Sequence, residues 1–309
     1  MKVSYLILLI VMNCFWAGSL SIYKSLSGQL DAGCIVTLRF GLAAIMLAVC
    51  WPWLPGKAPR GLDLAKTAAM GLIVFMLGHC LQVWGVKHGT AGNASVLMAM
   101  EPILTSVGAA FFLREHVGPR RWMGFSLGIL GVLLLNGFLS GGVQWVGFKA
   151  SLVFMSSFLC EAVYSIMGKG LIERAGIMKV LALALFSGTA ANLAINGRET
   201  FAAVRVMPLD SWWQVLYLAT ICTAIGYAIW FVVIKETDVN VTAMTIFMQP
   251  IAGVIIAALW LHETPHWGQF WGCAAIVAGL VIGLSRQVGV ARQKNPSISA
   301  CQSQEHNAP

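Results

Sequence analysis

The stretch 92-GNASVLMAMEPILTSVGAAFFLRE-115 is an apolar run that is interrupted by Glu101-Pro102 and closed by Leu113-Arg114-Glu115. The same order returns 148 positions later without a gap, with Gln249-Pro250 in place of Glu101-Pro102 and Leu261-His262-Glu263 in place of Leu113-Arg114-Glu115. Glycines on both sides keep the same spacing, as in the pairs Gly78 and Gly226, Gly124 and Gly272, and Gly131 and Gly279. This duplication predicts one structural unit that is used twice.

The composition indicates that lipid surrounds most of the chain. Of its 309 residues, 58% are hydrophobic and only 10% are charged, and the mean hydropathy is +0.79. One soluble core could not bury so much apolar surface. Crossing a hydrocarbon layer of about 30 Å takes about 20 apolar residues in a helix. The segments are continuously apolar, whereas barrel strands would alternate, so we predict an all-α membrane protein.

Ten segments of suitable length predict ten transmembrane helices. They are Val3–Tyr23, Cys34–Trp53, Ala65–Val86, Gly92–Leu113, Trp122–Leu139, Val146–Met167, Met178–Ile195, Trp212–Ile234, Val239–Leu261 and Phe270–Leu284. Because each half holds an odd number of helices, the second half must enter the membrane from the opposite side. We therefore expect two inverted five-helix repeats, residues 1–140 and 141–285. Residues 286–309 are polar and predict a disordered cytoplasmic tail.

The distribution of Lys and Arg predicts the orientation. Most of them fall in the short loops on the side of the N-terminus, which places both termini in the cytoplasm. The first segment also has features of a secretory signal peptide, but its single flanking lysine and its match to Val146–Met167 favour a retained span. The basic residues that give the net charge of +8 are confined to short loops, so the charge reflects topology and no nucleic-acid partner is expected.

No motif supports an enzyme, a cofactor or a metal site. A P-loop, a GxSxG turn and a dinucleotide-binding turn are all absent from the sequence, and the eight cysteines form no CxxC pair. One stretch, His262 to His266, fits the zinc motif HExxH. Pro265 inside it would break the helix that must hold both histidines on one face, and the first repeat has no histidine at either equivalent position. The sequence therefore predicts no metal ligands.

Two acids lie deep in apolar segments and are candidates for substrate or proton binding. A charge at the bilayer centre costs about 3 kcal/mol on insertion scales, so Glu101 and Glu161 are expected to face an interior cavity. Glu101 is the stronger candidate, because its counterpart in the second repeat is the neutral Gln249. The alternative is a protonated or hydrogen-bonded glutamate that only fixes helix packing. Two roles are equally supported for Arg39, which could bind an anionic group or extend to the membrane interface.

Features that occur in both repeats are better explained by architecture. Pro102 and Pro250 predict mid-helix kinks beside a cavity. Glu115 and Glu263 follow the ends of apolar helices, where a carboxylate can accept from free helix N-terminal amides, which suggests structural or gating roles. GxxxG spacing among the glycines predicts close helix packing, with a homodimer surface as the alternative. Aromatic and polar residues of the third and eighth segments would line a pocket or form an interface belt: His79, Gln82, Trp84, Tyr227 and Trp230.

The order of these motifs resembles the EamA-type branch of the drug/metabolite transporter superfamily. The resemblance covers Val3 to Leu284 and rests on Phe15-Trp16-Ala17-Gly18 followed by Lys24, on Arg39-Phe40, and on the two prolines each followed by Glu thirteen residues later. It implies a bacterial inner-membrane secondary carrier, often an exporter of amino acids, with a central cavity between the halves. Carried onto this chain, it points to Trp16, Gln82, Glu101, Glu161, Tyr164, Tyr227 and Gln249 as substrate-binding positions.

We therefore expect a carrier that exports a small polar or amphipathic metabolite by alternating access. Glu101 is the expected site of proton coupling or of contact with a substrate amine. The alternative within the superfamily is a flippase or transporter of a lipid-linked or nucleotide-sugar-type substrate, and an intramembrane enzyme is a third.

Overall fold

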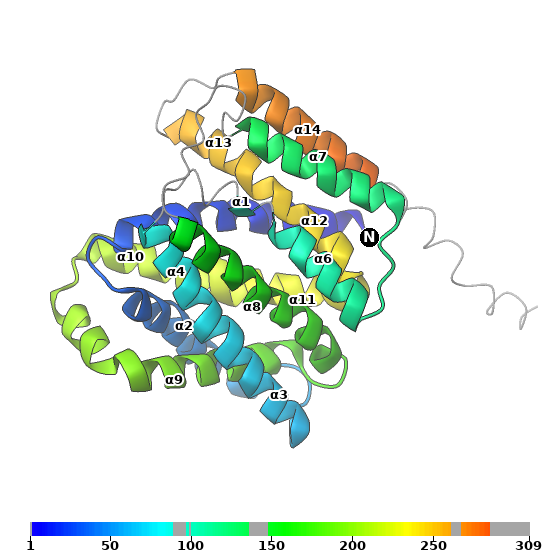
Figure 1. The fold of residues 1–309 in the computed structure, drawn as a ribbon. Coiled ribbons are helices and arrows are strands. Elements are labelled where there is room, and N and C mark those ends of the chain that lie inside the picture. Colours follow the sequence, from blue (N-terminus) through cyan, green and yellow to red (C-terminus); the bar gives the residue numbers. More distant parts are fainter. Residues whose placement is uncertain (1, 89–96, 99, 136–147, 261–266, 285–309) are drawn as a thin grey trace, which may run out of the picture.

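The computed structural model describes residues 2–88, 97–98, 100–135, 148–260 and 267–284, and these residues form helices and no strands (Figure 1). Glu263, the HExxH stretch and the predicted tail 286–309 lie outside the described residues.

Among the described residues, six helices are long and apolar enough to cross a membrane. Four of them are uninterrupted α-helices: α1 (Val3–Leu26), α2 (Ala32–Val49), α8 (Phe148–Ile172) and α9 (Ile177–Val206). The other two each contain a π-helical segment. In the first, α3 (Leu62–Gly71) runs through Leu72–Gly78 into α4 (His79–His88), and in the second, α10 (Leu209–Tyr217) runs through Leu218–Ile225 into α11 (Gly226–Glu236).

None of the remaining α-helices in the described residues is longer than α2: α6 (Glu101–Phe112), α7 (Pro119–Leu135), α12 (Val239–Met244), α13 (Met248–Trp260) and α14 (Trp267–Leu284). Large apolar side chains such as Phe111, Phe186 and Val281 point outward and are more than half exposed, as expected for lipid-facing surfaces. The prediction of an all-helical, multi-pass membrane protein is therefore confirmed. The count of ten spans stays a prediction, because four of the predicted spans fall on these remaining helices.

Pro102 and Pro250 occupy positions that differ from the predicted mid-helix kinks. Pro102 is in the first turn of α6, and Pro250 is in the first turn of α13, directly after the 3₁₀ segment Thr245–Phe247. A proline in a first turn removes no intrahelical hydrogen bond, because the N–H there has no partner within the helix. The chain between α12 and α13 is thus irregular before the proline and regular after it.

Helices of one half pack against their counterparts in the other. The most extensive contacts join α7 to α14 and α2 to α9, and α6 also packs against α12 (Figure 1). A Cβ atom added at Gly124 would lie 2.7 Å from the Gly279 carbonyl oxygen, and one at Gly131 would lie 2.6 Å from the Gly272 carbonyl oxygen. Gly124 and Gly272 are equivalent positions of the repeat, as are Gly131 and Gly279. The contact of Gly124 with Gly279 is therefore the repeat equivalent of the contact of Gly272 with Gly131. The glycines therefore serve packing within the chain.

Ion pairs join helix ends that the predicted topology places on the same side of the membrane. Lys2 contacts Glu236 at 2.9 Å, Arg174 contacts Asp63 at 2.8 Å, and Lys169 contacts Glu115 at 2.8 Å. At the other end of the bundle, Lys87 contacts Asp31 at 2.8 Å. All four contacts agree with the expected order of helix directions.

Candidate functional site

A cavity lies where helices of the two halves meet. It is lined by Trp16, Ser19, Leu20, Arg39, His79, Gln82, Met98, Glu101, Thr105, Glu161, Tyr164, Ser165, Tyr227, Trp230 and Gln249. All of them except Met98 come from α1, α2, α4, α6, α8, α11 and α13. The cavity volume is about 50 Å³, which accommodates a few water molecules. A metabolite would need more room than this.

His79 is the most connected polar side chain of the cavity. Its Nε2 atom lies 2.9 Å from Glu161 Oε1 and 2.7 Å from the Tyr227 hydroxyl oxygen. On the other edge of the ring, Nδ1 lies 3.2 Å from Gln82 Oε1. The ring is only 3% exposed, so its polar contacts are made inside the protein. His79 thereby links α4 to α8 of the second repeat and to α11.

The π-helical segments end where the cavity begins. Leu72–Gly78 directly precedes His79, and Leu218–Ile225 is followed by Gly226 and Tyr227. His79 and Tyr227 are 148 positions apart, so both repeats carry the irregularity at the same place. The second π segment presents the carbonyl oxygen of Cys222 to Trp16, whose Nε1 donates to it at 2.7 Å. Such bulges frequently occur at functional sites, because they reorient the side chains that follow.

Arg39 is buried in the cavity wall. It is 3% exposed, and its Nε atom donates to Thr223 Oγ1 at 2.8 Å. Nη1 donates to the Tyr23 hydroxyl oxygen, and the guanidinium carbon lies 4.8 Å from the centre of the Phe40 ring. An arginine that extended to the interface would be exposed at its charged end. That alternative is therefore wrong for Arg39.

Glu101 and Gln249 occupy equivalent positions of the repeat, but their surroundings differ. Gln249 Nε2 donates to Asn13 Oδ1 at 3.0 Å, and Asn13 Nδ2 in turn donates to Thr245 Oγ1 at 3.2 Å. Glu101 accepts no hydrogen bond from any residue that the structure describes, and it shares the cavity with Glu161. The polar groups around Gln249 thus hydrogen-bond to one another, whereas the cavity beside Glu101 carries two carboxyl groups.

All seven residues expected to bind substrate line this one cavity. They are Trp16, Gln82, Glu101, Glu161, Tyr164, Tyr227 and Gln249. Their roles stay predictions. Trp84 is elsewhere, stacked on His88 at a ring distance of 4.1 Å. No sequence pattern distinguishes Thr223 or Asn13, because isolated Thr and Asn residues are common in apolar helices.

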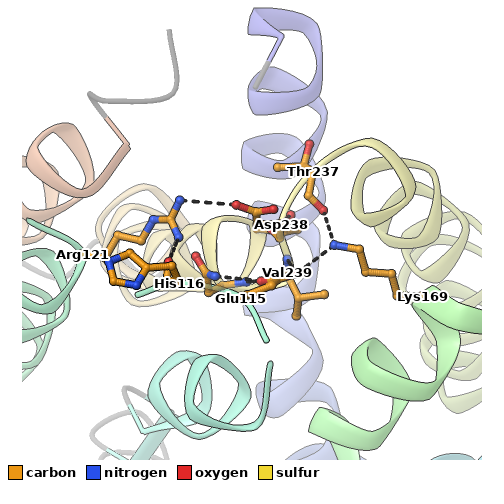
Figure 2. Close-up of polar contacts among 9 residues, drawn as sticks. Glu115, His116, Arg121, Lys169, Thr237, Asp238 and Val239 are labelled. Atoms are coloured by element: carbon orange, nitrogen blue, oxygen red, sulfur yellow. Dashed lines mark hydrogen bonds and ion pairs between the residues drawn. The ribbon is translucent and has the colours of Figure 1, made fainter. Parts of the chain in front are cut away.

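A second polar cluster joins the residues that follow α6 to the end of α8 and the start of α12 (Figure 2). The Glu115 carboxylate accepts from Lys169 Nζ at 2.8 Å, from Val239 N at 2.9 Å and from Asn240 N at 3.1 Å. It also accepts from Asn240 Nδ2 at 2.7 Å. Lys169 in turn donates to the Thr237 carbonyl oxygen at 3.1 Å. Glu115 therefore holds the N-terminus of α12 in the second half and the end of α8, where its charge faces the positive end of the α12 dipole.

Arg121 extends this cluster. It donates to the His116 carbonyl oxygen at 2.6 Å and to Asp238 Oδ2 at 3.4 Å (Figure 2). The cluster, defined here as the Glu115 network, consists of Glu115, Lys169, Thr237, Asp238, Val239, Asn240 and Arg121.

Comparisons with known proteins agree on one family. A family model described as the EamA-like transporter family matches the chain twice, over residues 3–137 and 148–284. A probable terminal-alkyne amino-acid exporter from Streptantibioticus cattleyicolor is 26% identical over 279 residues, which cover 90% of this chain and 92% of that protein. A probable amino-acid metabolite efflux pump from Escherichia coli is 26% identical over 238 residues, which cover 74% of this chain and 78% of that protein.

A solved crystal structure has the same fold. It aligns with a TM-score of 0.73 over 96% of this chain and 100% of its own, at 16% sequence identity.

Proposed function

The chain belongs to the EamA-like transporter family, and from that premise we propose that it is a secondary-active exporter of small polar or amphipathic metabolites such as amino acids. The family is one of membrane transporters, so the chain is a transporter and not an enzyme. Export of amino acids is supported by the two relatives described above, a probable terminal-alkyne amino-acid exporter and a probable amino-acid metabolite efflux pump. Residence in a bacterial inner membrane, with both termini in the cytoplasm, completes the proposal.

The observation that carries it is the cavity between the two halves. Helices of both repeats supply its walls, and its lining combines carboxyl groups, an arginine, a histidine and aromatic rings. Trp16 lies 5.4 Å from Tyr227 and 6.0 Å from Trp230, measured between ring centres. Such a lining suits a small molecule that carries both charged and apolar groups.

Two features support alternating access as the mechanism. The cavity is too small for a metabolite in this conformation, and the Glu115 network ties the two halves together at one end. We propose that this network breaks when the cavity opens toward that end. Rocking of one repeat against the other around a central site is the usual motion of carriers built from inverted repeats.

Proton coupling is assigned to Glu101. A carboxyl group in a cavity that opens alternately to the two sides can take up a proton on one side and release it on the other. The ionisable and charged groups around the same cavity are Glu161, His79, Arg39, Tyr23, Tyr164 and Tyr227. Glu161 is engaged with His79, which leaves Glu101 as the acid whose proton can exchange without breaking a contact to a described residue.

The test is transport by the purified protein in proteoliposomes, with and without an imposed pH gradient. Labelled amino acids serve as substrates. Wild type should accumulate label against its gradient when protons flow, and Glu101→Gln should abolish this dependence but keep exchange of label across the membrane. Glu199→Gln, an exposed glutamate of α9, is the matched control and should behave as wild type. Gradient dependence that persists in Glu101→Gln would remove the assignment, and wild type that moves no amino acid would refute the proposed function.

A further inference from the structure

Arg39 is a buried cation whose contacts within the described structure are all uncharged. Its partners are a threonine hydroxyl, a tyrosine hydroxyl and two aromatic rings, Phe40 at 4.8 Å and Tyr23 at 5.5 Å from the guanidinium carbon. None of the ion pairs among the described residues includes Arg39. A buried charge without an opposite charge is strongly disfavoured, so an anion is the expected missing partner.

The acids of the cavity do not supply that partner. Glu161 is paired with His79 at 2.9 Å, and no ion pair joins Arg39 to Glu101. His79 lies between Arg39 and Glu161 in a chain of polar contacts. Arg39 Nη1 donates to the Tyr23 hydroxyl oxygen, which lies 3.4 Å from His79 Nδ1, and His79 Nε2 lies 2.9 Å from Glu161 Oε1. The cavity lining therefore carries a positive group, Arg39, and two acids, Glu101 and Glu161, with His79 between Arg39 and Glu161.

The guanidinium keeps one donor group for a ligand. Nε and Nη1 are used by Thr223 and Tyr23, whereas Nη2 has no hydrogen bond to a described residue, and Arg39 lines the cavity. A guanidinium is planar and always charged, and its geometry matches a carboxylate. Because Thr223 and Tyr23 fix its plane, little rotamer freedom remains to be lost when a ligand binds.

We propose that Arg39 forms the carboxylate subsite of the cavity, and that substrates bind as zwitterions with the ammonium group toward Glu101 and Glu161. This inference rests on the proposed function and specifies it. The aromatic rings of Trp16, Tyr227 and Trp230 add cation–π attraction for the ammonium group. A free amino acid meets both ends of the cavity, whereas an amine that lacks the carboxylate meets only one.

The experiment compares each amino acid with its decarboxylated amine. The pairs are leucine with isoamylamine and phenylalanine with phenethylamine, supplied as labelled compounds to proteoliposomes that hold wild type, Arg39→Lys or Arg39→Gln. A hydrogen bond to a charged group contributes enough that wild type should prefer the amino acid by about tenfold or more. Arg39→Gln should reduce that preference to about twofold or less. Arg39→Lys should retain part of it, because the lysine ammonium keeps the positive charge but lacks the paired N–H donors of the guanidinium.

The preference ratio separates recognition from folding. A variant that is merely less stable transports both members of a pair less well and leaves the ratio unchanged, and that result would overturn the subsite. Equal transport of amine and amino acid by wild type would also overturn it, and this comparison needs no variant. If wild type moved neither member of either pair, the proposed amino-acid export would fail, and the subsite with it.

Discussion

Glu115→Gln removes one negative charge from the Glu115 network and changes almost nothing in shape. The Glu115 side chain is 7% exposed and Lys169 is 18% exposed, so the substitution leaves a largely buried ammonium beside a neutral amide. Breaking a fully buried pair by removing one partner costs about 3–5 kcal/mol. Because Lys169 keeps some contact with water, we expect about 2–3 kcal/mol here, which corresponds to about a 30- to 150-fold change in an equilibrium constant.

That change should favour the conformation in which the cavity is open at the Glu115 end, since we propose that the network is intact only in the closed conformation. The assay uses a cysteine-free protein with Thr105→Cys, because Thr105 lines the cavity and is 2% exposed. A membrane-impermeant maleimide applied from the Glu115 side should label this cysteine about 30-fold faster or more in Glu115→Gln. Labelling from the other side should become slower.

Two further variants complete the design. Lys169→Met should produce a similar shift, and the double variant should add little to either single change, because both remove one interaction. Arg174→Gln breaks the exposed Arg174–Asp63 pair at the same end, and such pairs contribute about 0–1 kcal/mol, so labelling should stay close to the unmodified rate. Faster labelling from both sides would indicate general loosening, and unchanged labelling would show that the network does not hold this end closed.

Two other predictions concern the cavity and the packing of the halves. Thr223→Val removes the acceptor of Arg39 Nε, so the preference for amino acid over amine should fall about twofold to threefold, which is less than in Arg39→Gln. Thr220→Val, whose hydroxyl bonds only the Leu216 carbonyl oxygen among described residues, should leave the preference unchanged. Gly124→Ala forces a Cβ to within 2.7 Å of the Gly279 carbonyl oxygen and should destabilise the protein by about 1–3 kcal/mol, seen as a lower melting temperature in detergent. Gly170→Ala, where a Cβ meets nothing within 4 Å, should not lower it.

The duplication made the helical class and the shared cavity accessible from the sequence. Glu101 and Glu161 could be placed in a cavity because lipid excludes unpaired charge, and Gln249 followed from the repeat. A membrane environment also weakens the sequence signal for helix geometry. A continuously apolar segment has no polar face to mark its period, so the π segments before His79 and Tyr227 leave no trace in the hydrophobic pattern.

Long-range partners were beyond sequence reasoning for a different reason. Glu115 was expected to accept from helix N-terminal amides, but nothing local indicates that these belong to α12, more than 120 residues away. Arg39 had two readings, because an arginine that reaches the interface and one that lines a cavity look the same in sequence. Only the packing of α2 against the π segment of Leu218–Ile225 distinguishes them.

The central claim is that two halves of opposite orientation surround one cavity, and the orientation of equivalent positions tests it most directly. Arg120, at the start of α7, and Gly268, at the start of α14, are 148 positions apart. Reporter fusions at these two residues, one with a domain active only in the cytoplasm and one with a domain active only outside it, would assign the face of each. We predict a cytoplasmic position for Arg120 and an external position for Gly268; both residues on the same face would contradict the inverted arrangement and the alternating-access carrier built on it.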